Sequence, residues 1–158
     1  MKNLKYIFLI LIINSCGIVG ISDINKKLGN SYHFLGEGGA QSYIYYTSSS
    51  SGRYPSIEEI SIWPTVLSFD YDENFIIAKQ SPDEKTIKQC LMFFKDKSSE
   101  SADSIMKTDT FFLNMFARDT CYWIINKKDK VIKGPYNFSS FQKEKSIIGV
   151  PNKLHLRK

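Results

Sequence analysis

Short apolar runs separated by polar turns occupy most of this 158-residue chain. Many of the runs are rich in Val, Ile, Tyr, Phe and Trp, and one alternates apolar with polar residues through Leu67, Phe69 and Tyr71. Both features are typical of β-strands. The predicted strands span residues 31–35, 42–47, 57–62, 65–71, 75–80, 89–95, 121–126 and 131–133.

The segment 104–118 has a different pattern. Ile105, Phe112 and Met115 recur at helical spacing, which predicts a helix. The apolar tripeptide at 111–113 would also suit a strand, so both interpretations stay open for this segment.

A second, shorter helix is predicted near the C-terminus. Ser139 and Gln142 have the spacing of a capping box, which predicts a helix over about residues 139–145. Together the patterns predict an α+β domain with an antiparallel sheet of about six to eight strands and one or two short helices. A small β-sandwich or a barrel-like roll is the alternative.

The first sixteen residues form a separate pattern. Lys2 and Lys5 precede an unbroken apolar run at 6–13, which is the layout of a secretory signal peptide. As a helix this run would extend about 12 Å, far less than the roughly 30 Å of a bilayer core. We therefore do not expect a permanent transmembrane helix here.

The residues that follow this run resemble the lipobox of bacterial lipoproteins. Ile13, Ser15 and Cys16 match its positions −3, −1 and +1, while Asn14 departs from the small residue usual at −2. The resemblance implies cleavage before Cys16 and acylation of that cysteine, which would anchor the chain in a membrane. A secretory signal that happens to contain a cysteine, or a short membrane anchor, is the alternative.

This resemblance defines the expected domain organisation. We expect a signal peptide at 1–15, a lipidated Cys16 with a tether at 16–30, and one globular domain at 31–158. The expected location is the cell envelope, in the outer membrane and facing the periplasm.

Removal of Lys2 and Lys5 with the signal peptide would lower the formal charge from +5 to +3. The remaining basic residues gather in the tail, at Lys153, Arg157 and Lys158, and around a predicted hairpin turn, where Lys127, Lys128, Lys130 and Lys133 form a lysine cluster. We expect this cluster to be a solvated surface, with anionic lipid or an acidic partner as the alternative contact. Export argues against nucleic acid as a partner.

The other two cysteines are candidates for a disulfide. If Cys16 is acylated, Cys90 and Cys121 remain as a pair in an oxidising compartment. A bridge between them would stabilise the fold by roughly 3–4 kcal/mol. Two buried thiols in neighbouring strands are the alternative.

No catalytic or metal-binding motif is present in the sequence. Asp70, Asp72 and Asn74 resemble the opening of a calcium loop, but Phe75 and Ser81 stand where an EF-hand needs Gly and Glu. We therefore interpret the acids as a hairpin turn and expect no metal and no cofactor. His33 and His155 stand near opposite ends of the domain, and there is no G-x-S-x-G elbow.

A second resemblance covers about residues 62–154. The motifs FIIAKQ at 75–80, YWIINKK at 122–128 and GPYNFSSF at 134–141 resemble a family of small, functionally uncharacterised bacterial lipoproteins. Asn126 stands where that family has Asp. The motifs are typical of a scaffold, and the resemblance implies no activity.

These observations favour a non-enzymatic envelope lipoprotein that binds a protein or peptide. One alternative is an envelope hydrolase that uses Asp70, Asp72 or Glu73, which would need an acid with a raised pKa in a deep pocket. The other is an inhibitor or immunity-type lipoprotein.

Overall fold

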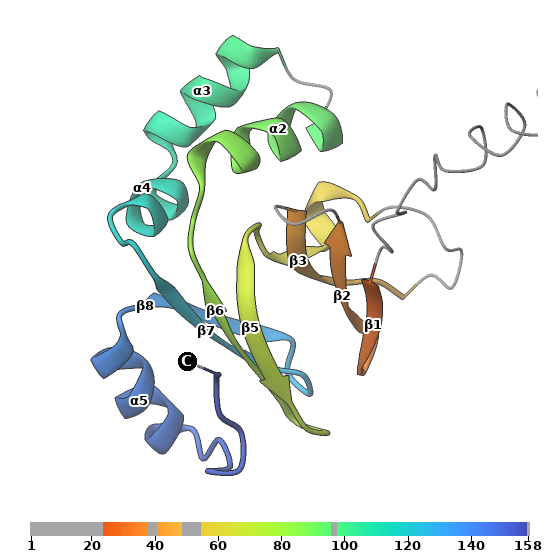
Figure 1. Ribbon diagram of the computed structural model, residues 1–158, viewed down its shortest axis with the longest axis vertical. Coiled ribbons are helices and arrows are strands. Elements are labelled where there is room, and N and C mark those ends of the chain that lie inside the picture. Colours follow the sequence, from red (N-terminus) through yellow and green to blue (C-terminus); the bar gives the residue numbers. More distant parts are fainter. Residues whose placement is uncertain (1–23, 38–40, 49–54, 96–97, 158) are drawn as a thin grey trace, which may run out of the picture.

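A computed structural model describes residues 24–37, 41–48, 55–95 and 98–157 (Figure 1). The predicted signal peptide, Cys16 and the first part of the predicted tether lie outside the described residues. Within the described part, no helix is both long and apolar enough to span a bilayer.

The strands form two antiparallel sheets of four strands each. Sheet A consists of β1 (Ile24–Gly29), β2 (Tyr32–Glu37), β3 (Gln41–Tyr46) and β4 (Ile60–Ile62). Sheet B consists of β5 (Val66–Tyr71), β6 (Phe75–Gln80), β7 (Cys121–Asn126) and β8 (Val131–Tyr136). In each sheet every strand pairs with the next one along the chain, so that β5 and β8 are the edges of sheet B.

The helices separate into two groups. A short 3-10 helix, η2 (Ile57–Glu59), precedes β4. Helices α2 (Glu84–Lys95), α3 (Ser99–Thr108) and α4 (Thr110–Phe116) follow β6 and gather at one end of the sheets (Figure 1). Helix α5 (Phe138–Ile147) follows β8 and lies beside sheet B (Figure 1).

The main core lies between the two sheets and helices α2 to α4. Ile44 and Ile62 from sheet A, Ile76 and Trp123 from sheet B, and Leu91 from α2 belong to this one cluster of buried side chains. A smaller cluster, built on Ile77, Ile124 and Phe141, fills the space between the other face of sheet B and α5. Sheet B is therefore covered on both faces.

A buried lysine joins the two sheets. Lys127, directly after β7, is only 3% exposed, and its Nζ donates a hydrogen bond of 2.7 Å to the carbonyl oxygen of Leu28 in β1. Burial lowers the pKa of Lys127, partly offset by Asp72 and Glu73, which raise it. The prediction that the lysine cluster is a solvated surface is therefore wrong for Lys127, although Lys128 and Lys130 are exposed.

The α+β class and the antiparallel strands are confirmed, but the strands divide into two sheets and the described part has four α-helices. The strand predicted at 89–95 is wrong, because these residues belong to α2. Ile87, Cys90 and Leu91 are all buried and recur at the spacing of a helix face.

Three smaller differences concern the bounds of elements. The predicted helix 104–118 breaks into α3 and α4 because Asp109 is extended and its carboxylate accepts the Phe111 N–H at the start of α4. Helix α5 is capped by Asn137 rather than Ser139. Strand β8 continues through Gly134 and Pro135 to Tyr136 instead of ending before them.

The end of the predicted tether is also ordered as a strand. Ile24–Gly29 forms β1, paired with β2, and Leu28 is completely buried in the main core. This strand has only one buried residue, so its sequence carries too weak an apolar signal to predict it.

Candidate functional site

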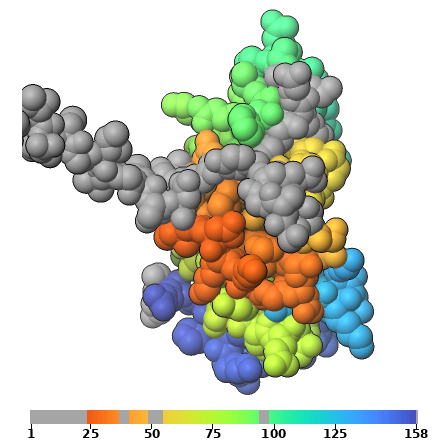
Figure 2. Space-filling view, turned by 90° about the vertical axis from the view of Figure 1, so that its right-hand side faces the viewer, coloured from red at the N-terminus to blue at the C-terminus, as the bar shows by residue number. Residues whose placement is uncertain are grey.

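Of the hollows on the described surface, two are opposite in character. The first, which we call the β5 groove, has a volume of about 400 Å³ and runs along strand β5, next to sheet A and the C-terminal segment. It is lined by residues of β1, β2, β5 and the C-terminal segment: Lys26, Phe34, Val66, Leu67, Ser68, Phe69, Asp70, Tyr71, His155 and Arg157. Figure 2 shows orange sheet A, the yellow-green β5–β6 hairpin and the dark blue C-terminal residues meeting on one face.

The β5 groove exposes the backbone edge of β5. The Asp72 N–H donates to the carbonyl oxygen of Phe75 in β6. Because hydrogen-bonded and non-hydrogen-bonded residues alternate along an antiparallel ladder, the peptide groups of Phe69 and Tyr71 point away from β6. The Asp70 carboxylate accepts the Tyr71 N–H at 2.9 Å, and Ser42 Oγ donates to the Val66 carbonyl at 2.7 Å. The open part of the edge is therefore centred on Phe69.

Aromatic rings and cations form the walls of the β5 groove. The rings of Phe34 and Phe69 lie 4.6 Å apart, and Lys26 Nζ lies 5.4 Å and 5.1 Å from the ring centroids of Phe69 and Tyr71. Arg157 adds a second permanent positive charge. Asp70 is the only acid among the lining residues.

The C-terminal segment is fixed beside β5 by contacts with acidic side chains. The His155 backbone N–H donates to Asp70 Oδ2 at 3.0 Å, and Lys153 Nζ lies 3.8 Å from Asp72 Oδ2. The acids of the hairpin therefore hold the wall that carries His155 and Arg157.

The same contacts bear on the hydrolase hypothesis. Burial alone would raise the pKa of Asp72, but hydrogen bonds from the Phe75 and Asn74 N–H groups, with Lys153 and Lys127 nearby, lower it. A general acid needs the opposite shift. Asp72 thus acts as the turn residue that the sequence predicted, while Glu73 is exposed at the tip of the hairpin.

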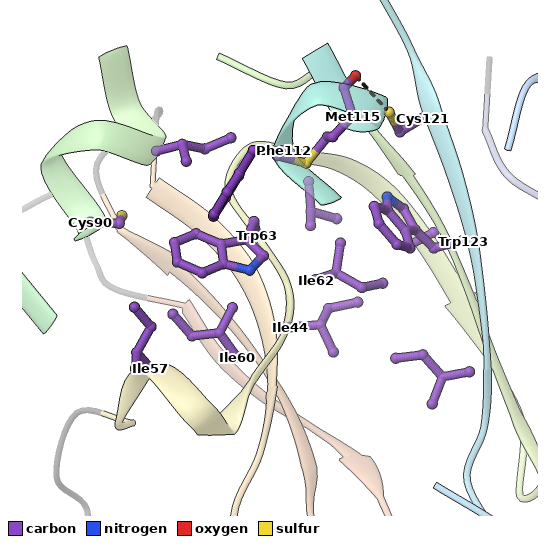
Figure 3. Close-up of a cluster of buried hydrophobic side chains, with 14 of the residues drawn as sticks. Ile44, Ile57, Ile60, Ile62, Trp63, Cys90, Phe112, Met115, Cys121 and Trp123 are labelled. Carbon is purple, nitrogen blue, oxygen red and sulfur yellow. Dashed lines mark hydrogen bonds between the residues drawn. The ribbon is translucent and has the colours of Figure 1, made fainter. Parts of the chain in front are cut away.

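The second hollow, which we call the aromatic pocket, has a volume of about 470 Å³. It lies where η2 and β4 approach α3, α4 and strands β7 and β8. Its lining combines four aromatic side chains, two acids and several aliphatic side chains: Ile57, Glu58, Ile60, Ser61, Trp63, Ile105, Asp109, Phe111, Phe112, Trp123, Ile132 and Gly134. Figure 3 shows Trp63, Phe112 and Trp123 around the centre of this region.

A buried glutamine fixes the two tryptophans. Gln80 Oε1 accepts the Trp123 indole N–H at 2.7 Å, while Gln80 Nε2 donates to the backbone carbonyls of Trp63 and Pro64 at 2.8 Å and 3.0 Å. The rings also contact one another, with centroids 5.2 Å apart for Trp63 and Phe112 and 6.0 Å apart for Phe111 and Trp123.

Gly134 allows Trp123 to lie against strand β8. Its φ of +135° is rarely adopted by other residues, and a Cβ atom there would come within 2.7 Å of the Trp123 ring and 2.8 Å of the Tyr122 carbonyl oxygen. Glycine is therefore required at this point of the pocket wall.

The two cysteines are buried on different elements, Cys90 on α2 and Cys121 on β7. They lie on opposite sides of the cluster in Figure 3, with Trp63 between them. Because Cys90 lies on a helix, the two residues are not in neighbouring strands, and the disulfide stays a prediction. Burial, against a smaller opposing effect of Arg118, raises the pKa of Cys121 to about 11, which makes this thiol a poor nucleophile at neutral pH.

The two histidines do not meet. His33 stacks on Tyr45 in sheet A at 5.2 Å, whereas His155 is exposed beside Asp70. In the described ranges, no group of three or more His, Cys, Asp and Glu side chains could hold a metal ion.

The geometry defines a small two-sheet α+β domain. The chain belongs to the family described as "Protein of unknown function (DUF3997)", whose model matches residues 29–158. No curated protein and no solved structure gives a significant match.

Proposed function

We propose that this chain is an envelope lipoprotein, anchored through Cys16, whose domain binds an extended acidic segment of a protein partner along β5. The observation that carries the proposal is the open backbone of Phe69 inside a groove that has Lys26 and Arg157 in its walls. The proposal describes a binding module rather than an enzyme.

The backbone provides the affinity in this mode of recognition. An extended peptide that adds a strand to a sheet edge gains main-chain hydrogen bonds, and alternate side chains then enter pockets beside the edge. Sheet edges are usually blocked against such pairing. Here Ser42 and Asp70 occupy the two ends of the β5 edge and leave the stretch around Phe69 open.

The side chains provide the selectivity. Lys26 and Arg157 favour acidic side chains on the incoming strand, and the exposed Leu67 and the Phe34 and Phe69 rings offer apolar contact. A basic segment would meet two like charges at close range, which disfavours it.

The anchor rests on the sequence alone. Ile13, Ser15 and Cys16 support lipidation, which would hold the domain at the envelope membrane, where we place the partner. The periplasmic face of the outer membrane is the location that we propose.

Strand addition is tested with short fluorescent peptides and the full-length chain in detergent micelles. Acidic, neutral and basic peptides of equal length are compared by fluorescence anisotropy, and the acidic set should bind most tightly. Methylation of alternate backbone nitrogens in the best acidic peptide should abolish its binding. Unchanged binding after methylation would exclude strand addition.

The groove is tested with charge reversals. Lys26→Glu and Arg157→Glu should each weaken the acidic peptide about tenfold, equivalent to roughly 1.4 kcal/mol. Lys143→Glu is the matched control, because Lys143 is an exposed lysine of α5 outside the groove. Equal losses in all three variants would show that only net charge matters.

The anchor is tested by metabolic labelling with a fatty-acid analogue. The wild-type chain should carry the label, and Cys16→Ala should lose it and leave the membrane fraction. Labelling that persists in Cys16→Ala would refute the anchor without affecting the peptide experiments.

A further inference from the structure

We propose that the aromatic pocket binds a small organic cation that carries a quaternary ammonium group on an apolar body. This site is separate from the β5 groove and does not depend on the function proposed for it.

The lining of the aromatic pocket carries negative charge. Glu58 and Asp109 are the charged side chains of the aromatic pocket, and the described lining contains no Lys, Arg or His. This is notable in a chain whose formal charge is positive. A ligand of opposite sign is therefore complementary to this hollow, whereas an anion is not.

The aromatic pocket is also rich in aromatic rings. Trp63, Phe111, Phe112 and Trp123 line it together with the two carboxylates; Phe111 is half-buried and the other three rings are buried. Aromatic faces attract cations, tryptophan most strongly, and cages of such rings recognise quaternary ammonium groups. The carboxylates add a direct electrostatic attraction that a purely aliphatic pocket lacks.

In the described part of the chain, these rings lack a cation of the protein itself. Elsewhere in the domain, lysines lie over aromatic faces: Lys26 over Phe69 and Tyr71, and Lys130 over Tyr46 at 4.6 Å. Among the described residues, no lysine or arginine lies over the four rings of the aromatic pocket.

The walls of the aromatic pocket are preorganised. Trp63 is 8% exposed and Trp123 1% exposed; Gln80 accepts the Trp123 indole N–H and donates to the Trp63 backbone carbonyl. The volume of about 470 Å³ lies in the range of about 300–1,000 Å³ typical of small-molecule sites. The walls therefore exist before a ligand enters, which reduces the entropic cost of binding.

The test uses the intrinsic fluorescence of the full-length chain. Both of its tryptophans line the aromatic pocket, so a ligand there should change the emission directly. The probe is choline, and the control ligand is 3,3-dimethyl-1-butanol, which has the same shape with a neutral carbon in place of nitrogen. We expect a saturable change with choline and at least tenfold weaker binding of the alcohol.

Two neutralising variants locate the charge effect. Asp109→Asn removes the charge but retains a good N-cap for α4, and Glu58→Gln changes a residue outside the capping box of η2. Each should weaken choline about three- to tenfold and leave the alcohol unchanged. Glu100→Gln is the control, since Glu100 is an exposed acid of α3 outside the pocket.

The outcomes separate clearly. Three outcomes would each overturn the proposal. They are equal binding of choline and the alcohol, no saturable change with choline, and wild-type affinity for choline in the Glu58→Gln, Asp109→Asn double variant. Far-UV circular dichroism of every variant verifies the fold. Lys26→Glu serves as a cross-control, because it should not alter choline binding.

Discussion

The aromatic pocket and the β5 groove differ in what holds their walls. Trp63 and Trp123 are almost fully buried, and the buried Gln80 bonds the Trp123 indole and the Trp63 backbone carbonyl, so the pocket is hollowed into the main core. In the groove, Leu67 is 57% exposed, and Lys26 and Arg157 are exposed side chains. The walls of the pocket are therefore mainly core side chains, whereas the walls of the groove include exposed surface side chains.

This difference separates stability from binding. A change in the support of the pocket should unfold the protein before it alters recognition, because a buried polar group left without a partner costs its full desolvation energy. A change in the walls of the groove should alter recognition while the fold remains intact, since exposed positions have little effect on stability. Four substitutions test this contrast.

The largest effect is expected for Gln80→Ala. This change leaves the Trp123 N–H and the carbonyls of Trp63 and Pro64 without their partner and opens a cavity between them. We expect a loss of about 3–5 kcal/mol in the free energy of unfolding. Urea denaturation followed by circular dichroism measures it, with the exposed Gln142→Ala as control. A loss below about 1 kcal/mol would mean that the pocket is not held by this network.

The next largest effect is expected for Gly134→Ala. The new methyl group meets both the Trp123 ring and the Tyr122 carbonyl oxygen at a φ that alanine disfavours. We expect a loss of about 2–4 kcal/mol. Gly149→Ala is the control, because Gly149 also has a positive φ, +72°, but no atom within 4 Å of the added Cβ. Equal losses of stability in the two variants would show that the contact with Trp123 is not the cause of the loss.

A smaller effect is expected for Asp72→Ala in the hairpin beside the groove. The carboxylate accepts two backbone N–H groups, so its loss should cost about 1–1.5 kcal/mol at neutral pH. Because folding lowers the pKa of Asp72, its contribution is present above the ordinary value of 3.8 and is lost as the pH falls through the folded-state pKa.

Unfolding curves of wild type and Asp72→Ala should therefore converge in acid. Glu73→Ala, an exposed acid in the same turn, should show no such convergence. A difference between wild type and Asp72→Ala that persists below the folded-state pKa would assign the effect to packing instead.

The smallest effect on stability is expected for Arg157→Glu. Arg157 is an exposed residue of the C-terminal segment, so the free energy of unfolding should change by less than about 0.5 kcal/mol. The same variant should weaken the acidic peptide about tenfold. Loss of peptide binding together with a large loss of stability would contradict the proposed independence of the groove from the core.

Much of the fold was predictable because local patterns define it. The strands at 75–80 and 121–126 were predicted with the bounds that the structure has, since both are compact apolar runs between turns. Helix α2 was missed because its apolar second half, taken alone, resembles a strand. The buried Ile87, one turn before Cys90 and Leu91, is the residue that indicates the helical period.

The hollows were not predictable from local patterns. The aromatic pocket joins Trp63, Phe112 and Trp123 from distant parts of the chain, and only the packing of β4, α4 and β7 brings them together. One signal was available: Gln80 is a polar residue at the end of a strand whose first four residues are apolar, and a buried polar residue needs partners. The edge position of β5 depends on the division into two sheets, which the strand pattern does not determine.

The hydrogen bond from Lys127 to Leu28 has a mechanical consequence. Strand β1 is the described strand closest to the N-terminus, so tension applied there would reach it first. Along the chain, that tension would have to pass through all of sheet A before it reached sheet B, but Lys127 carries it directly from β1 to the end of β7. Strand β1 is thus held at two places, by its pairing with β2 and by the hydrogen bond from the end of β7 in the sheet that is covered on both faces.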